Sequence, residues 1–554
     1  MKGRLYSFLA VVAILFFAFL AGFALLHPGL PPTHDGEYHV IRFFLFNEAL
    51  RDGNLYPRWA AHLNNGLGVP LFNFVYPLPN YVASILHFVN ISFIDSFKIS
   101  MFLATIIGGV FFYLWSKEFW GRLGGIVSSV FYTFSPYHFV DIYIRGSIGE
   151  VWALGFFPAF LWAYTRFVAT KRKTFLVFSS LSLALIIFSH NILALMFFLF
   201  SLSYIFLLIC IEKNKKYLIL YTFYLILLGL GLSAIFWFPA IYETKYVTGL
   251  QIFDVASHFP DLYQLLIPSW GSGFSGGGLQ NELSFQIGIA NLIAVFLSTI
   301  VIFLQVKRKD KKVYYSLFFL VWFVFVLFLM LGISKPVWKL VPFMNYFQFP
   351  WRLLSIEILF ASFLAGSIFS LVGSKHAKIR MFFAILLVFF AFILGIRYAK
   401  PAYYMYRDDK YYTSRSNFID GTNSPGNVFN TIYLKSIPAK EKERTVFLKG
   451  KGEIILTKAR SNVYSFEINA IANSEIQANL AYFPGWEVYV NDKKESLKSA
   501  QNGRFTFLVP KGKNKVEIIF KDTLVRKISA LISLASLGFM IALLINKRSV
   551  TIKK

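Results

Sequence analysis

The sequence is short of charge and almost free of cysteine. Only 15% of its 554 residues are charged, whereas soluble domains average about 25%. The single cysteine, Cys210, excludes an intrachain disulfide and a zinc site built from cysteines. The pattern HExxH is missing, and "GSGFSGGG" lacks the lysine of a phosphate-binding loop. These absences exclude several common soluble enzyme classes and favour a membrane protein.

Long apolar runs take the place of those motifs, and 56% of the residues are hydrophobic. A helix needs about 20 apolar residues to cross the hydrocarbon core. Runs of about this length occur at 5–26, 96–116, 122–136, 150–169, 174–190, 191–211, 217–238, 284–305, 313–332, 351–372, 380–397 and 524–545. The first is longer than a secretory signal requires, so we expect it to be retained. The sequence predicts an α-helical polytopic membrane protein with about 12 transmembrane helices.

Basic residues gather in alternate connectors between these runs, as in "TRFVATKRK" and "VKRKDKK". The formal net charge of +27 therefore follows the positive-inside rule and does not indicate nucleic acid as a partner. The pattern predicts a multi-pass plasma-membrane protein with both termini in the cytoplasm. The extracytoplasmic side then has a first loop at 27–95 and a long segment at 398–522.

The residue pattern changes near residue 443, where short β-branched and aromatic runs alternate with turns such as "PGW" and "PKGKN". This is typical of an antiparallel β-sandwich. We expect three parts: a transmembrane domain at 1–397, an extracytoplasmic region at 398–522 with the sandwich from about 443, and a final helix with a cytoplasmic tail at 523–554.

The first polar cluster, "PPTHDGEYHV", follows directly on the first apolar run and holds His34, Asp35, Glu37 and His39. Asp35 precedes an amphipathic helix start, so it suits an N-cap. It equally suits a catalytic site, because ionisable groups beside a membrane are costly and often functional. The sequence alone does not decide whether Asp35 is a helix cap or a catalytic residue.

Further polar residues lie on the same predicted side: Arg145 and Glu150 in "YIRGSIGEVW", His190 in "FSHN" and Arg352 in "FQFPWRLL". The alternatives are a solvated Arg145–Glu150 pair, a polar turn at His190 and a snorkelling arginine at position 352. These residues predict a polar pocket at the outer surface of the membrane.

Several motifs, in order, resemble the bacterial membrane proteins described as 6-pyruvoyl-tetrahydropterin synthase related and the YfhO-like proteins. They are "THDGEYHVIRF", "LYPRW", "GLGVPLFNFVYPLP", "YIRGSIGEVWAL", "FSHN", "FWFPAIYE" and "FQFPWRLL". The C-terminal "YFPGWEVYVNDKKESLKSAQNGRFTFLVPKGKNKVEIIF" is similar to the β-domain of YfhO. Both families look like GT-C glycosyltransferases, so the resemblance implies a GT-C-like fold.

The resemblance also implies a function: transfer of a sugar from a polyprenyl-phosphate carrier to an envelope acceptor on the extracytoplasmic face. By position in the first loop, Asp35 carries over as the catalytic carboxylate, with Glu37 as a second candidate. Arg58, Arg145 and Arg352 carry over as ligands of the lipid phosphate.

We expect the remaining candidates, His34, His39, Glu150 and His190, to contact substrate. Metal use is open because GT-C enzymes vary in it, and no pterin is expected. A transporter of lipid-linked saccharides and a non-catalytic envelope scaffold are the alternative functions.

Overall fold

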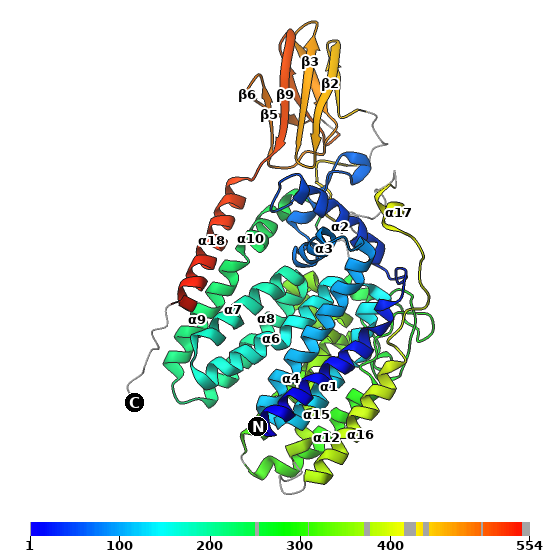
Figure 1. The fold of residues 1–554 in the computed structure, drawn as a ribbon, viewed down its shortest axis with the longest axis vertical. Helices are drawn as coiled ribbons and strands as arrows, with labels where there is room; N and C mark the ends of the chain where they lie inside the picture. The colour runs from blue at the N-terminus through cyan, green and yellow to red at the C-terminus, as the bar shows by residue number, and fades with distance from the viewer. Residues whose placement is uncertain are drawn as a thin grey trace.

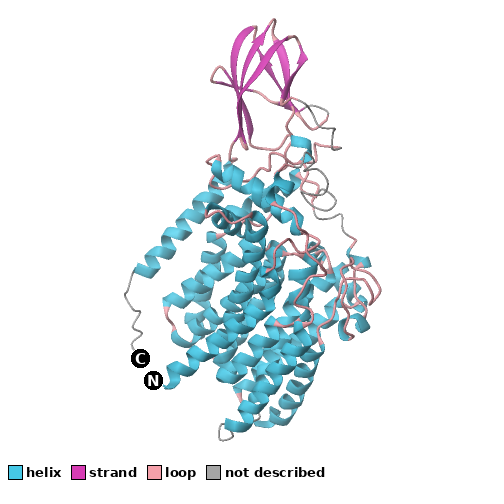
Figure 2. Ribbon diagram, turned by 45° about the vertical axis from the view of Figure 1, so that its right-hand side comes forward, coloured by secondary structure: helices cyan, strands magenta, loops and turns pink. Residues whose placement is uncertain are grey.

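The computed structural model describes residues 2–249, 254–308, 310–370, 377–414, 428–435, 443–499 and 502–545. The predicted cytoplasmic tail lies outside the described residues, as do 415–427 and 436–442 within the predicted extracytoplasmic segment. Two parts are visible: a helical bundle and, at one end of it, a β-sandwich (Figures 1 and 2). The N-terminal end of α1 and the C-terminal end of α18 point away from the sandwich (Figure 1). The predicted fold class is confirmed.

The bundle is built from long apolar helices joined by short ones. The helices are α1 Lys2–Gly22, α2 Gly36–Arg51, α3 Leu78–Phe88, α4 Phe93–Thr133, α5 Pro136–Phe139, α6 Ile148–Thr170, α7 Lys173–Ser189, α8 Asn191–Ile211, α9 Lys215–Leu232, α10 Ala234–Glu243, α11 Leu262–Leu266, α12 Ile289–Gln305, α13 Lys311–Met330, α14 Lys335–Leu340, α15 Leu354–Ser367, α16 Ala377–Ile396, α17 Asp409–Thr413 and α18 Leu524–Ile545. Most of α6 is buried, and it packs against α4, α7 and α8.

Within the described ranges, 8 helices are long and apolar enough to cross a membrane. The apolar helices α7, α12 and α15 are shorter, with 17, 17 and 14 residues. The number of about 12 spans therefore stays a prediction. Large apolar side chains are exposed along α16 and α18, as expected of helices that contact lipid.

Helix α4 contains two of the predicted runs and reverses direction at Gly121, where φ is +73°. The hydroxyl of Ser129 donates a hydrogen bond of 2.6 Å to the carbonyl of Gly109. In one straight helix these residues would lie about 30 Å apart. The two limbs therefore form a hairpin, and glycine permits the left-handed backbone at its turn.

The sandwich consists of two antiparallel sheets with the strand orders β1-β4-β8-β7 and β2-β3-β9-β5-β6. The strands are β1 Thr445–Lys449, β2 Gly452–Arg460, β3 Val463–Ala470, β4 Ser474–Ala478, β5 Trp486–Val490, β6 Lys493–Glu495, β7 Lys498–Ser499, β8 Phe505–Val509 and β9 Gly512–Phe520. Burial alternates along β5 and in much of β9, so one face of their sheet packs inward.

The first loop contributes to the core of the sandwich. Trp59 is 1% exposed, and its ring lies 5.3 Å from the ring of Trp486 and 5.2 Å from that of Phe520. Leu67 and Phe74 join the same buried cluster. Loop and sandwich therefore share one hydrophobic core, although about 400 residues separate them in the chain.

An ion-pair network with a buried Arg526–Glu243 pair at its centre joins the same parts, and we call it the Glu243 cluster. Its members are Arg58, Asn73, Glu243, Asp522, Thr523 and Arg526. Glu243, at the end of α10, accepts hydrogen bonds from Arg526 (Nε, 3.1 Å), Asn73 (2.8 Å) and Thr523 (3.0 Å). Arg526, at the start of α18, also donates to the carbonyl of Pro484. This cluster fixes the first loop, α10 and the sandwich to one another.

Candidate active site

A second buried cluster surrounds Glu150, a fully buried residue in the first turn of α6. Arg145 brackets its carboxylate, with Nη1 2.8 Å from Oε2 and Nη2 2.6 Å from Oε1. Nε of Arg352 lies 3.0 Å from Oε1. That contact is an ion pair without hydrogen-bond geometry, because Nε of Arg352 has no hydrogen-bond partner among the described residues. Two guanidinium groups therefore share one buried carboxylate.

Asp141 and Tyr137 complete the arginine side of this cluster. Both precede Arg145 on the short helical segment 136–145 that connects α4 to α6. Arg145 donates to Oδ1 of Asp141, while the hydroxyl of Tyr137 lies 3.3 Å from both Arg145 Nη1 and Glu150 Oε2. Burial lowers the pKa of Arg145, but the Glu150 and Asp141 carboxylates outweigh it and hold that pKa well above its ordinary value. Arg145 is therefore a permanent cation.

Asp141 differs from Glu150 in its surroundings. Burial, together with the nearby charge of Glu150, raises the pKa of Asp141 well above its usual range, against the opposing effect of Arg145. Its Oδ2 atom is buried and has no hydrogen-bond partner among the described residues. The cluster thus holds a polar atom that no described protein group satisfies.

His190 approaches from the junction of α7 and α8. Its Nδ1 accepts a hydrogen bond of 3.2 Å from the backbone N–H of Leu193, so it caps α8. An accepting Nδ1 carries no proton, which makes the imidazole neutral and places its proton on Nε2. Nε2 lies 3.9 Å from Oε1 of Glu150. We call Tyr137, Asp141, Arg145, Glu150, His190 and Arg352 the Glu150 cluster.

Asp35 lies beside this cluster, at the N-cap position of α2. Its backbone N–H donates a 2.9 Å hydrogen bond to the carbonyl of Arg145. The side chain of Asp35 makes no capping hydrogen bond, and the hydroxyl of Thr33 instead accepts from the N–H of Gly36 at 3.1 Å. The carboxylate of Asp35 is therefore not used for helix capping.

Charges of both signs surround the Asp35 carboxylate. Burial raises its pKa, while Arg145, Arg42 and His34 oppose that rise. Arg42 lies on α2 and is itself buried. The ring of Tyr76 lies 5.1 Å from that of His190 and also lies near Asp35 and Arg42. Tyr76 therefore connects the surroundings of Asp35 with the Glu150 cluster. Asp35 is thus a carboxylate that has both a raised pKa and two arginines nearby.

The two histidines of the first polar cluster have different surroundings. Nε2 of His34 is 2.9 Å from the carbonyl of Ser272, and its ring stacks on Phe274 at 5.2 Å. His39 is buried against Phe97, and burial lowers its pKa well below the ordinary value. His39 is therefore neutral at physiological pH.

Two predicted site residues lie elsewhere. Glu37 is half-buried and pairs with Arg407, the Nη1–Oε1 distance being 2.8 Å. Arg58 belongs to the Glu243 cluster, where it donates to Asp522 at 3.1 Å, Asn73 at 2.9 Å and the carbonyl of Ile235 at 3.2 Å. The structure brings Asp35, Arg145, Glu150, His190 and Arg352 together and keeps Glu37 and Arg58 apart from them.

Burial also decides between the alternative interpretations of the two arginines. Arg145 does pair with Glu150, but Arg145 is only 6% exposed, so the pair is not solvated. Arg352 is also 6% exposed, which excludes a snorkelling arginine. Its Nη1 donates to the carbonyl of Phe347 at 3.0 Å and to the side chain of Gln348 at 2.6 Å.

Sequence reasoning missed Tyr137, Asp141 and Tyr76 as neighbours of the site. Asp141 lies four residues before Arg145, a spacing that favours an ion pair on one helical face, so the signal was present. Tyr76 had no local signal, since it reaches His190 only through the folding of the first loop.

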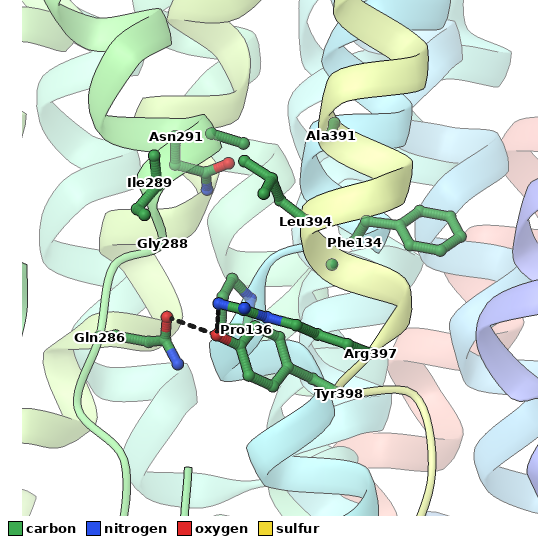
Figure 3. A pocket seen from close by; sticks show the side chains of 12 residues that line it. Phe134, Pro136, Gln286, Gly288, Ile289, Asn291, Ala391, Leu394, Arg397 and Tyr398 are labelled. Carbon is green, nitrogen blue, oxygen red and sulfur yellow. Dashed lines mark hydrogen bonds between the residues drawn. The ribbon is translucent and has the colours of Figure 1, made fainter. Parts of the chain in front are cut away.

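A separate crevice lies between Pro136, the start of α12 and the end of α16 (Figure 3). Arg397, Tyr398 and Gln286 line it, and the hydroxyl of Tyr398 is 3.3 Å from Oε1 of Gln286. Its volume is about 10 Å³, which is about the space of one water molecule. It does not have room for a sugar. Among the described residues, no three His, Cys, Asp or Glu side chains form a group that could hold a metal ion.

Comparison with known families divides the chain into two matched regions. A family model described as the 6-pyruvoyl-tetrahydropterin synthase related domain of membrane proteins matches residues 72–400. A model of the bacterial membrane protein YfhO matches residues 429–533. Arg145, Glu150, His190 and Arg352 lie inside the first range, whereas Asp35 precedes it.

One relative is an uncharacterized protein from Lactococcus lactis subsp. cremoris (strain MG1363). It is 26% identical over 256 residues, which cover 43% of this chain and 40% of the relative. The chain thus matches less than half the length of that protein.

Three solved membrane enzymes are similar at low sequence identity. Arabinofuranosyltransferase AftD from mycobacteria is 12% identical, with a TM-score of 0.46 over 73% of this chain and 27% of that one. The Archaeoglobus fulgidus oligosaccharyltransferase is 12% identical, with a TM-score of 0.42 over 71% and 53%. ArnT from Cupriavidus metallidurans, bound to undecaprenyl phosphate, is 11% identical, with a TM-score of 0.38 over 70% and 63%.

Proposed function

The chain belongs to the family of membrane proteins with the 6-pyruvoyl-tetrahydropterin synthase related domain, and we propose that it is a membrane glycosyltransferase. The donor is a sugar on a polyprenyl-phosphate carrier, and the acceptor is a hydroxyl of an envelope polymer, glycan or protein on the extracytoplasmic face. The observation that carries the proposal is the Asp35 carboxylate, free of capping and held beside Arg145 and Arg42.

The reaction needs a base and a cationic site for phosphate. Asp35 takes the proton of the acceptor hydroxyl while that oxygen bonds to the anomeric carbon of the sugar. The bond between this carbon and the phosphate oxygen breaks, and the electron pair leaves with the polyprenyl phosphate. A single displacement of this kind inverts the anomeric centre. The raised pKa of Asp35 makes it a stronger base than an exposed aspartate.

The arginines supply the phosphate site. Nη1 of Arg352 donates to Phe347 and Gln348, and Nε forms an ion pair with Glu150 without a hydrogen bond. Its Nη2 donates to none of the described residues. A phosphate oxygen is a suitable acceptor for this remaining guanidinium nitrogen. Glu150 holds Arg145 and Arg352 close together against their mutual repulsion. His190 is neutral, so its role is a hydrogen bond and not a charge.

A reconstituted system tests this function. The full chain is placed in liposomes with a panel of radiolabelled polyprenyl-phosphate sugars and an envelope-polymer acceptor, and label on the acceptor is counted. We expect transfer by the parent protein and a loss of about 10²–10⁴-fold for Asp35→Asn, the range typical of a general base. Movement of the labelled carrier across the bilayer, without label on any acceptor, would instead establish a transporter.

A further inference from the structure

A cavity of about 310 Å³ opens at the far end of α6 from the Glu150 cluster. It lies where the turn of α4, the C-terminal ends of α6 and α8, and the start of α13 meet. Its lining residues are Glu118, Phe119, Thr165, Val168, Ala169, Leu208, Ile211, Glu212, Asp310, Lys311, Lys312 and Tyr315. Fifteen residues of helix separate Glu150 from Thr165, which is about 22 Å. The cavity is therefore distinct from the candidate active site.

The inner wall of this cavity is apolar. Val168 from α6, Leu208 from α8 and Phe119 from α4 are all buried, and all three belong to the hydrophobic core of the bundle. A volume of this size holds a small ligand or part of a larger one. Such a wall suits hydrocarbon, so we expect at least part of the occupant to be apolar.

One half of the rim is acidic. Glu118 and Glu212 both line the cavity, and each also has a basic neighbour: Arg166 lies 3.2 Å from Glu118, and Lys171 lies 3.7 Å from Glu212. Helices α6 and α8 end here, and the C-terminus of a helix carries partial negative charge. In both pairs the contact is to Oε2, and Oε1 of each glutamate makes no hydrogen bond to a described residue, so this half of the rim can take a further cation.

The other half is basic. Lys311 and Lys312 are exposed, and they begin α13. Asp310 caps this helix, since its Oδ1 accepts from the N–H of Lys312 at 3.0 Å. The N-terminus of a helix carries partial positive charge and binds phosphate readily. This half of the rim favours an anion.

We propose that the cavity binds an aminophospholipid with a zwitterionic headgroup. The phosphate contacts Lys311, Lys312 and the start of α13, the primary ammonium contacts Glu118 and Glu212, and the first acyl carbons lie on the apolar wall. A purely anionic lipid would face the carboxylates, and a purely cationic ligand would face the lysines. A choline headgroup carries no N–H donor for the carboxylates.

Native mass spectrometry of the full chain in detergent tests this. Phosphatidylethanolamine, phosphatidylglycerol and phosphatidylcholine with identical acyl chains are added separately, and bound lipid is measured. We expect one phosphatidylethanolamine to bind at least tenfold more tightly than the other two. Lys311→Gln/Lys312→Gln and Glu118→Gln/Glu212→Gln should each weaken it at least fivefold. The matched control is Lys215→Gln/Lys216→Gln, which removes two exposed lysines from the start of α9.

Several outcomes would overturn the proposal. Equal binding of the three lipids would mean that the cavity does not recognise the headgroup. Equal loss of binding in the two lysine double variants would mean that lysines anywhere on this surface attract lipid by charge alone. Displacement of phosphatidylethanolamine by equal concentrations of soluble phosphoethanolamine would show that the apolar wall contributes nothing. If the lysine variant does not fold, as judged by its thermal transition, the glutamate variant tests the other half of the rim. Asp35→Asn should leave lipid binding unchanged, which separates this site from the proposed transfer reaction.

Discussion

Two buried arginine–glutamate clusters in this protein differ in how completely their polar atoms are satisfied. In the Glu243 cluster, the Glu243 carboxylate accepts from Arg526, Asn73 and Thr523, and all three nitrogens of Arg58 donate hydrogen bonds. In the Glu150 cluster, Oδ2 of Asp141 and Nε of Arg352 are buried without hydrogen-bond partners among the described residues.

The difference supports the proposal that the Glu243 cluster serves structure and the Glu150 cluster serves the transfer reaction. A fully partnered network can hold protein segments together, and removing one member leaves a buried charge uncompensated. Unpartnered buried polar atoms are costly, so a native site that keeps them commonly serves a ligand or a reaction. The two clusters look alike as arginine–glutamate pairs, but only the Glu150 cluster lies beside Asp35.

The largest effect on stability is expected from Arg526→Met. This change leaves Glu243 buried without its guanidinium, and breaking a buried pair costs about 3–5 kcal/mol. Chemical unfolding of the purified protein, followed by tryptophan fluorescence, measures the loss. Lys527→Met is the matched control, because Lys527 is the next residue on α18 and is exposed. Equal stability of the two variants would contradict a structural role for the Glu243 cluster.

Arg352→Gln should instead reduce catalysis. Glu150 keeps its two hydrogen bonds to Arg145, so its charge stays compensated and we expect a loss of about 1 kcal/mol or less in stability. The phosphate loses a charged donor, which we expect to lower kcat/KM by about 10–100-fold, equivalent to about 1.4–2.7 kcal/mol. Initial rates of sugar transfer measure this. If Arg352→Gln transfers sugar at the parent rate but has lost much of its stability, Arg352 has a structural role and not a catalytic one.

The pH dependence should report the raised pKa of Asp35. A base must be unprotonated, so kcat/KM should fall as the pH drops through a value above the ordinary aspartate pKa of 3.8. Arg42→Gln removes a charge that lowers this pKa, so the acid limb should move to higher pH. An acid limb at or below pH 3.8, or one unmoved by Arg42→Gln, would contradict the assignment of Asp35 as base.

The raised pKa of Asp35 also determines whether Asp35→Asn raises or lowers the free energy of unfolding. A carboxyl whose pKa is higher in the folded protein stabilises the fold below its unfolded pKa, and this contribution is lost as the pH rises through the folded pKa. Asp35→Asn cannot ionise, so we expect its free energy of unfolding at pH 7 to equal or exceed that of the parent. The difference should disappear below about pH 3.8.

The smallest effect is expected from Glu37→Gln. Glu37 pairs with Arg407 at 2.8 Å, and both side chains are more than one-third exposed. Such pairs contribute about 0–1 kcal/mol. Transfer activity should stay within about twofold of the parent, which corresponds to less than 1 kcal/mol. A loss as large as that of Asp35→Asn would make Glu37 the catalytic carboxylate.

Much of the fold was predictable because its signals are local. Apolar length and the switch to alternating strands near residue 443 identified the bundle and the sandwich. Position after the first apolar run identified Asp35 as a candidate. The interpretation of the Asp35 side chain as a helix cap was wrong. The hydroxyl of Thr33 accepts from the N–H of Gly36 instead of the Asp35 carboxylate, and the sequence does not show which of the two side chains does so.

Other features depend on contacts between distant segments. Arg58 resembled a phosphate ligand, yet tertiary packing directs it to Asp522, 464 residues away. Arg352 meets Glu150 across about 200 residues, and Trp59 enters the sandwich core in the same way. No periodicity or spacing encodes these encounters, because they depend on how the elements pack.

The specific activity of Arg526→Met, counted per folded molecule, tests the division between the two clusters most directly. Folded protein is quantified by its thermal transition in the same liposome preparation that is assayed for sugar transfer. If the Glu243 cluster only holds the structure and the Glu150 cluster serves the reaction, the folded fraction should transfer sugar within twofold of the parent rate. A rate per folded molecule as low as that of Arg352→Gln would contradict this account.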